Sequence, residues 1–317
     1  MRGRLRTLAA AVLGVPLVLG VTSSGVHAAP TSCPGGSGSL AAADLQSRSF
    51  DVQDCGLRGR VVSNGTVSVT VPAPGTSLIA TAETTGGSTT LVAAVSSSGA
   101  LRVSQSTEKT AARPAQRSTG TTTRTSATTP DCNDHEQPPI FGFRDKLPDP
   151  FYLGAVSGVS VSDAEATLRS VVNQYNSLVN PCGVADQSTI DLVYAGRTQA
   201  AAQVTSDLHC TQPDGQQTVA FQELNGALAS TCTAMAGTAI TDWDMALNSQ
   251  TPWWTTGTCP SGAFELKSNL AHEFGHVVGL DHYSKDHRNL LMYGGLASCE
   301  QRSQLGWGEA TMLNRMY

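Results

Sequence analysis

Residues 271–282 constrain this chain more than any other stretch, because three histidines and a glutamate fall at fixed spacings within it. His272 and His276 are four residues apart in a segment, 264–278, whose apolar pattern predicts a helix. Four residues turn an α-helix by about 400°, so both imidazoles leave the same face about 6 Å apart along the axis. The two rings can therefore reach one metal ion.

The neighbouring residues complete the pattern of a catalytic zinc site. Glu273 lies on the adjoining flank of the helix, where it can reach a metal-bound water without displacing a ligand. Gly279 can adopt a positive φ and turn the chain, so that His282 returns as a third nitrogen ligand. Three protein ligands leave the fourth position of zinc for water, which is typical of catalytic rather than structural zinc. We therefore expect one catalytic Zn²⁺ on His272, His276 and His282.

This stretch resembles the zinc motif of the metzincin metallopeptidases, H-E-x-x-H-x-x-G-x-x-H, at every fixed position. Met292 in Leu291-Met292-Tyr293 resembles the family's structural Met-turn, whose methionine lies beneath the metal. A tyrosine directly after that methionine is similar to the matrixin branch. The resemblance extends loosely over residues 140–317. It implies an α+β fold, in which a twisted sheet carries an active-site helix and a carboxyl-terminal helix.

The same resemblance implies a zinc-dependent endopeptidase that acts on protein or peptide substrates. Glu273 would then be the general base that takes a proton from a metal-activated water. Residues 240–248 resemble the edge strand before the active-site helix, so we expect an extended substrate to pair with 244–248. Trp253 and Trp254 are candidates for the rim of the cleft, with packing as the alternative.

A second class of function is a secreted binding or surface module that retains a vestigial zinc site. Zinc binding needs the histidines but not a base, so the intact Glu273 favours the enzyme. Calcium is a further candidate cofactor through Asp214, Asp242 or Asp244, with scattered surface carboxylates as the alternative. The strand region offers only His209, so we do not expect the structural zinc that matrixins usually carry.

The start of the chain predicts export. Three arginines precede an apolar run over residues 8–21, and Val26-His27-Ala28 is typical of a cleavage site, so residues 1–28 are interpreted as a signal peptide. An uncleaved anchor is the alternative. The net charge of -5 disfavours nucleic acid as a partner. We expect a secreted, extracellular monomer that has no membrane contact after the signal is removed.

The eight cysteines form no C-x-x-C pair, so disulfides outside the cell are favoured over a thiolate zinc site. Local pairing in chain order predicts the bonds Cys33–Cys55, Cys132–Cys182, Cys210–Cys232 and Cys259–Cys299. Pro181-Cys182-Gly183 resembles the cysteine switch of animal matrixins, in which a pro-segment thiolate blocks the zinc. It follows the first helix of the catalytic domain instead of preceding the domain, so we favour the disulfide.

Composition divides the mature chain into three parts. Residues 29–104 predict a small β-rich segment, a possible propeptide, with a hairpin at Asn64-Gly65. Residues 105–130 are rich in Ser, Thr and Arg and poor in large apolar residues, which is typical of a linker. Residues 131–317 are predicted to form the zinc metallopeptidase domain.

Within this last part, local patterns predict several elements. The sequence Ser162-Asp163-Ala164-Glu165 predicts a capping box that opens a helix. Strands are predicted at 190–194, 218–221 and 245–247, and a final helix at 308–317.

Charge separates the two ends of the chain. Residues 1–130 carry 11 Lys and Arg against 5 Asp and Glu, whereas residues 131–317 carry 9 against 20. Opposite charges favour docking of the β-rich segment on the catalytic domain. We expect a latent precursor, a zymogen, that is activated by cutting near Arg113, Arg117 or Arg124. The alternative is that residues 29–130 are a permanent targeting module.

Overall fold

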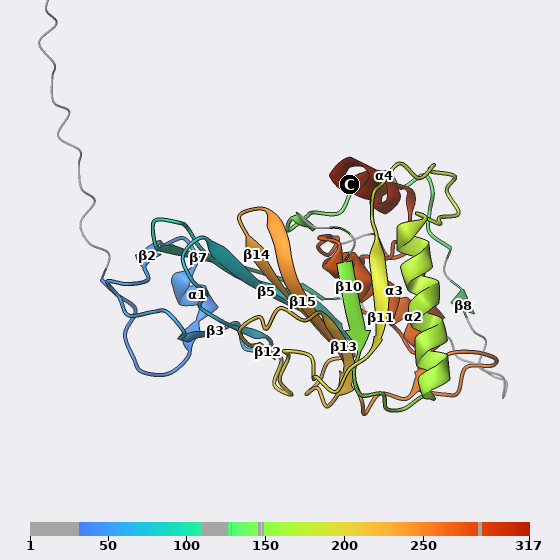
Figure 1. Ribbon diagram of the computed structural model, residues 1–317, viewed down its shortest axis with the longest axis horizontal. Coiled ribbons are helices and arrows are strands. Elements are labelled where there is room, and N and C mark those ends of the chain that lie inside the picture. The colour runs from blue at the N-terminus through green and yellow to red at the C-terminus, as the bar shows by residue number, and fades with distance from the viewer. Residues whose placement is uncertain (1–31, 110–125, 128, 145–146, 148, 285–286) are drawn as a thin grey trace, which may run out of the picture. The chain divides into compact units, whose positions relative to one another are not determined.

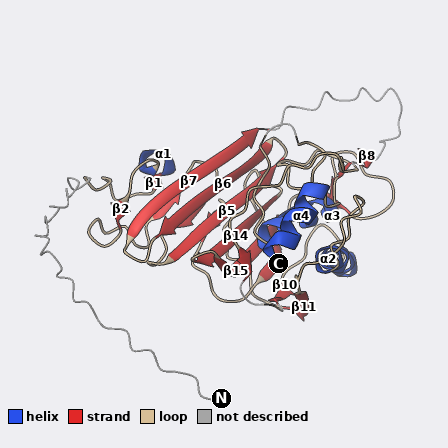
Figure 2. Cartoon of the chain, turned by 90° about the horizontal axis from the view of Figure 1, so that it is seen from above, coloured by secondary structure: helices blue, strands red, loops and turns tan. Residues whose placement is uncertain are grey.

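A ten-stranded sheet joins the amino-terminal segment to the carboxyl-terminal domain in the computed structural model (Figure 2). The structure describes residues 32–109, 126–127, 129–144, 147, 149–284 and 287–317. The expected signal peptide and the three linker arginines lie outside these residues. No helix in the described part of the chain is long and apolar enough to cross a membrane.

The carboxyl-terminal half of the sheet is mostly parallel. The strand order is β11-β10-β13-β15-β14, and only β14 runs antiparallel to its neighbour β15. The short strand β9 pairs with the start of β15. The bounds are β9 Phe143–Arg144, β10 Asp149–Leu153, β11 Leu192–Arg197, β13 Thr218–Gln222, β14 Ala229–Ala236 and β15 Ala239–Asn248. The strands at 218–221 and 245–247 are confirmed, although β15 is longer than predicted. The strand predicted at 190–194 begins two residues later.

The amino-terminal half of the sheet continues from β14 in the order β5-β6-β7-β2. Its strands are antiparallel, with bounds β2 Phe50–Asp51, β5 Thr76–Thr84, β6 Gly87–Val95 and β7 Ala100–Lys109. Strand β7 therefore extends beyond residue 104. Strand β5 pairs with the whole length of β14, from Ala229 opposite Glu83 to Ala236 opposite Thr76.

This pairing corrects the prediction that residues 244–248 form an exposed edge for substrate. They belong to β15, which lies between β13 and β14. In the carboxyl-terminal half the outermost strand on this side is β14, and β5 pairs with it. The sequence of β14 does not predict a strand, because its small and hydroxyl-bearing residues lack the alternation typical of a half-buried strand.

Three long helices cover one face of the carboxyl-terminal half (Figure 1). They are α2 Val161–Asn176, α3 Leu266–Val277 and α4 Trp307–Met316. The predicted helices are confirmed, but α2 begins earlier than expected. Its N-cap is Ser160, whose hydroxyl accepts from the backbone N–H of Asp163 at 3.1 Å. The core beneath α2 and α3 includes Phe151 and Phe274, whose ring centroids are 5.4 Å apart.

The remaining elements are short. A four-stranded sheet in the order β1-β3-β4-β12 contains the predicted hairpin, in which Asn64 Oδ1 accepts from the backbone N–H groups of Thr66 and Val67. Two further two-stranded sheets pair β16 with β17 and β18 with β8. The bounds are β1 Leu40–Ala41, α1 Ala42–Leu45, β3 Val61–Ser63, β4 Ser68–Thr70, β8 Ser126–Ala127, β12 His209–Cys210, β16 Trp253–Trp254, β17 Phe264–Glu265 and β18 Glu300–Gln301.

The four predicted disulfides are confirmed, with Cα–Cα distances between 5.2 and 5.6 Å. Cys33–Cys55 lies entirely in the amino-terminal segment, and the other three bonds lie entirely after residue 131. No disulfide therefore links the two sides of the linker. Noncovalent contacts hold them together instead, including a shared apolar cluster in which Leu78 and Ala80 of β5 join Ala234 and Ala246.

Candidate metal centre

Helix α3 presents His272 and His276 on one buried face, with ring centroids 4.9 Å apart. The chain then turns at Gly279, where φ is +91°. A Cβ atom at this position would lie 2.0 Å from the carbonyl oxygen of Gly142, so both the backbone conformation and the close approach require glycine. The turn returns the chain towards α3 and brings His282 to the other two histidines.

The three histidines meet through the same ring atom. Nε2 of His282 lies 3.1 Å from Nε2 of His276 and 3.1 Å from Nε2 of His272. Nitrogen ligands about 2.0–2.1 Å from a tetrahedral zinc ion lie roughly 3.3 Å from one another, so this spacing fits a shared Zn²⁺. All three side chains are buried. Burial also holds the pKa of His272 well below its usual range, which favours the neutral, metal-binding ring.

The opposite ring nitrogens fix the orientation of the histidines. Nδ1 of His272 donates to the carbonyl of Leu291, and Nδ1 of His276 donates to the carbonyl of Leu280, each at 2.8 Å. Nδ1 of His282 lies 3.2 Å from the hydroxyl of Thr90. Because the Nδ1 atoms of His272 and His276 carry the protons, their Nε2 lone pairs point to the shared centre.

Glu273 lies beside this centre and is fully buried. Its Oε2 accepts a 2.6 Å hydrogen bond from the hydroxyl of Thr231 on β14, and its Oε1 has no partner among the described residues. Burial raises the pKa of Glu273 well above its usual range, and the nearby Glu83 adds to this effect. The unpaired oxygen has the position and chemistry of a group that binds water or a proton.

Met292 packs beneath the histidines, as the Met-turn interpretation requires. A Cβ atom on Gly275, between the first two histidines, would lie 2.1 Å from Met292 Sδ, so only glycine allows this contact. The backbone N–H of Met292 donates to Oε1 of Glu309 at 2.8 Å, and the N–H of Gly306 donates to Oε2. Sequence reasoning missed Glu309, although an acidic residue in the first turn of the final helix was a usable signal.

Strands β14, β5 and β6 cover the centre. Residues alternate between the two faces of each strand, so Thr231, Thr81 and Thr90 form one row across the sheet on the side of α3. Thr231 bonds to Glu273, and Thr90 donates to Asp281 at 3.0 Å and contacts His282. In this arrangement the candidate ligands are at most 6% exposed and Glu273 is 0% exposed, so these side chains are closed off from solvent.

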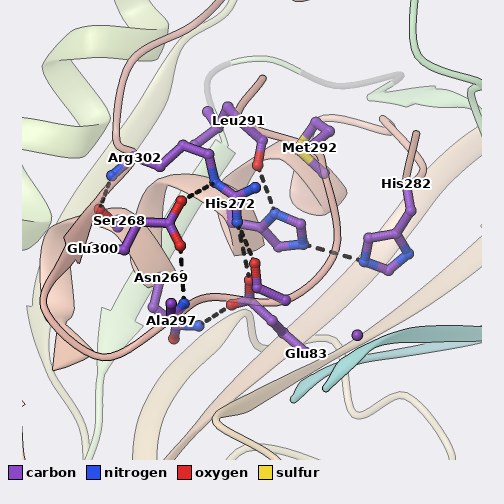
Figure 3. A network of polar contacts seen from close by, with 12 residues as sticks. Glu83, Ser268, Asn269, His272, His282, Leu291, Met292, Ala297, Glu300 and Arg302 are labelled. Atoms are coloured by element: carbon purple, nitrogen blue, oxygen red, sulfur yellow. Dashed lines mark hydrogen bonds and ion pairs between the residues drawn. The ribbon is translucent and has the colours of Figure 1, made fainter. Parts of the chain in front are cut away.

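Glu83 lies at the end of β5, in the same layer as this row (Figure 3). Its carboxylate and the ligand atoms of His272 and Glu273 all lie within 4.8 Å of one another. It accepts from the side chain of Asn269 and lies 4.0 Å from the guanidinium of Arg302. The sequence could have indicated Asn269, because this residue precedes His272 by one helical turn. No local pattern indicated Glu83 or Arg302, because the contact between them joins distant parts of the chain.

Several other predicted residues do not lie at the metal centre. Trp253 and Trp254 are each 6% exposed, so packing is their role and the rim prediction is wrong. Cys182 is bonded to Cys132 and has no thiol to act as a switch. His209 lies on β12, with Nδ1 3.0 Å from the hydroxyl of Ser68 and Nε2 3.1 Å from that of Thr70.

The three candidate calcium ligands form a separate cluster. Asp214, Asp242 and Asp244 each offer a carboxylate oxygen within 4.8 Å of the others. Asp242 accepts from the backbone N–H of Gly215 at 2.9 Å. Asp244 is buried, and its Oδ1 has no hydrogen-bond partner within the described residues. Burial, followed by the charges of its two neighbours, raises the pKa of Asp244 to about 9. Calcium at this cluster stays a prediction.

The family model described as Matrixin matches residues 187–317. The match includes α3, His282, Met292 and α4, so this part of the chain is similar to the matrixins, and its mixed α+β arrangement fits a metzincin-like fold. Similarity to this family supports a metallopeptidase and implies zinc as its metal. A comparison with curated proteins finds no match to the chain.

Proposed function

We propose that this protein is a secreted, zinc-dependent endopeptidase with Glu273 as its general base. The observation that carries the proposal is the convergence of three Nε2 atoms beside a buried glutamate, within the segment that matches the Matrixin family. The four disulfides support export, because such bonds persist in oxidising compartments.

The side chains divide the chemical work. His272, His276 and His282 would hold Zn²⁺, which when bound polarises a carbonyl and lowers the pKa of a bound water towards about 7. Thr231 holds Oε2 of Glu273 and leaves Oε1 available. Oε1 is therefore the atom that accepts a proton from the attacking water and returns it to the leaving amine.

Strand β14 supplies the binding edge for substrate. A peptide that adds to this edge forms main-chain hydrogen bonds with β14, the mode of recognition called β-augmentation. Strand β5 uses those same backbone groups, because it is antiparallel to β14 over all eight residues of that strand. A peptide and β5 cannot occupy the edge together.

This competition supports a latent form of the enzyme. The amino-terminal segment occupies the edge through β5 and covers the ligands through Thr90. No disulfide retains it across the linker, so a cut in the linker leaves only noncovalent contacts to hold it. The alternative remains a retained module that moves aside without a cut.

A secreted binding module with a vestigial zinc site is the competing function. It would need the three histidines alone. The Thr231 hydrogen bond and the unpaired Oε1 of Glu273 favour the enzyme, because they orient a group that zinc binding does not need.

A peptide library tests the proposal. The full chain, with its linker cut by limited trypsin treatment and the trypsin then inhibited, is incubated with mixed peptides and zinc. We expect internal cleavage that a zinc chelator abolishes and added zinc restores. Cleavage that survives the chelator would contradict the zinc chemistry. Binding of zinc without any cleavage would favour the binding module.

A further inference from the structure

Glu83 is a buried acid in a sheet whose neighbouring positions carry small or neutral side chains. It is 1% exposed and sits where β5 ends, with its side chain directed towards α3 (Figure 3). Its Oε2 accepts from the amide of Asn269, and its Oε1 lies 4.0 Å from Nη2 of Arg302. A buried carboxylate needs such partners, because desolvation penalises its charge.

Asn269 and Arg302 together form a socket for an acid. Asn269 is fully buried, and Arg302 is 3% exposed. Backbone carbonyls hold the guanidinium in place, since Arg302 donates to Gly295 and, at 3.3 Å, to Arg288. Glu300 also lies beside the guanidinium, with Oε1 3.8 Å from Nε. The Asn269 amide therefore supplies the hydrogen bond to Glu83, and the Arg302 guanidinium supplies a positive charge 4.0 Å away.

The socket adjoins the reacting groups. Asn269 precedes His272 by three residues on α3, so both side chains lie on the same face of the helix. The Glu83 carboxylate, a ligand atom of His272 and an oxygen of Glu273 all lie within 4.8 Å of one another. A side chain in the socket therefore belongs to a residue close to the bond that the enzyme would cut.

The register of β5 shows which position of a substrate would reach the socket. Glu83 is opposite Ala229 of β14, two residues along from the pair Thr81 and Thr231. Thr231 is the residue that holds Glu273. A peptide that replaces β5 on β14 in the same antiparallel direction places one side chain where Glu83 now lies, because side chains alternate strictly along a strand.

We propose that Arg302 and Asn269 select an acidic side chain in the substrate, glutamate first, and that Glu83 is the chain's own substitute for it. This inference rests on the proposed peptidase function and adds its substrate class: peptides with glutamate at one fixed position beside the cleaved bond. An apolar side chain there would leave the buried amide of Asn269 without its acceptor and would remove the carboxylate that lies 4.0 Å from the Arg302 guanidinium. Sites that contain such donors discriminate strongly against ligands that lack the matching group.

Peptide cleavage gives the first test. The trypsin-cut full chain is incubated with peptides that differ at one position, which carries Glu, Gln or Leu. This position is chosen by aligning the sequences that are cleaved in the peptide library. We expect kcat/KM for Glu to exceed that for Leu at least tenfold, with Gln between them. The ratio of kcat/KM for Glu to kcat/KM for Leu should fall at least tenfold in Asn269→Asp, because a second carboxylate repels the acidic side chain of the substrate. The exposed control Asn225→Asp should leave this ratio unchanged. Equal rates for Glu and Leu would overturn the proposal while leaving the peptidase intact.

A second test needs no catalysis. In the intact full chain, Glu83→Ala removes the carboxylate and leaves room for a small acid. Propionate should raise the thermal midpoint of Glu83→Ala by several degrees more than that of the wild type, and propanol should not. The difference should disappear in Glu83→Ala combined with Asn269→Leu. Equal effects of propionate on the wild type and on Glu83→Ala would contradict an acid socket, whether or not the protein cleaves peptides.

Discussion

The hydroxyl oxygen of Thr90 lies 3.2 Å from Nδ1 of His282, although the two residues are 192 positions apart in the chain. The contact links strand β6 of the amino-terminal segment to the third candidate zinc ligand. Thr90 also donates to Asp281 at 3.0 Å. The amino-terminal segment thus contacts the loop that contains His282, and it also contacts β14, the edge strand that would bind substrate.

His282→Ala should weaken zinc retention. Two histidines on a helix remain, but the third nitrogen and its 3.1 Å approach to the others are lost. Metal analysis after dialysis against a weak chelator should find the wild type loaded and the variant depleted. His287→Ala is the matched control, because His287 pairs with Asp134 away from the centre. Full zinc occupancy in His282→Ala would remove this residue from the ligand set.

Glu273→Gln should retain zinc and the fold but lose activity by about 10²–10⁴-fold, because an amide cannot accept the proton of water. The amide is nearly isosteric, and its oxygen can still accept from Thr231. The rates of trypsin-cut wild type and variant on one peptide measure the effect, with the exposed Glu223→Gln as the control. A variant that cleaves at nearly the wild-type rate would show that another group is the base.

Glu309→Ala should destabilise the protein by about 2–5 kcal/mol, because it leaves the buried N–H groups of Met292 and Gly306 without their acceptor. Denaturant unfolding of the zinc-loaded full chain measures the loss. The exposed Glu223→Ala should change the free energy of unfolding by less than about 0.5 kcal/mol. Similar unfolding midpoints for Glu309→Ala and the wild type would contradict this role for Glu309.

Asp244 predicts a pH dependence of stability in calcium-free buffer. Burial raises its folded-state pKa to about 9, above the usual aspartate value of 3.8. Between these two pKa values the folded state holds a proton that the unfolded state has lost. The free energy of unfolding therefore falls as pH rises from 3.8 to about 9. Asp244→Asn removes this dependence, and its stability relative to the wild type should increase between pH 5 and 8.

Calcium should oppose that fall in the wild type, because a cation among the three aspartates favours their charged forms. Thermal midpoints measured at pH 8 with and without calcium test this, with magnesium as the comparison. Calcium should stabilise the wild type and leave Asp244→Asn unchanged. An equal effect of calcium on both proteins would place its binding elsewhere.

The sequence predicted that the three histidines meet, because the geometry that brings them together is local. The spacing of His272 and His276 is a property of one helix, and Gly279 marks the turn that returns His282. The disulfides followed from pairing in chain order. In each case the residues that must meet are near one another in the sequence or belong to one regular element.

The sequence predicted only that the amino-terminal segment docks on the rest of the chain through opposite charge. It did not predict the strand pairing through which the segment docks. Strand β5 pairs with β14 across about 150 residues of sequence, and no local pattern encodes such a pairing. The hydroxyls of β14 also obscured its burial. Ser230 donates to the carbonyl of Thr81 at 2.6 Å, so a polar strand is satisfied inside the sheet. The contact between Arg302 and Glu83 was missed for the same reason, because it joins distant segments of the chain.

The central claim is that strand β5 occupies the edge where substrate binds, so the intact chain is latent. The most direct measurement compares peptide cleavage by the intact full chain with cleavage by the same zinc-loaded protein after its linker is cut. A chelator-treated sample of each provides the background. We predict at least a tenfold rise in chelator-sensitive rate after the cut, accompanied by loss of the amino-terminal segment from the catalytic part on a sizing column. Equal chelator-sensitive rates before and after release of that segment would contradict the claim.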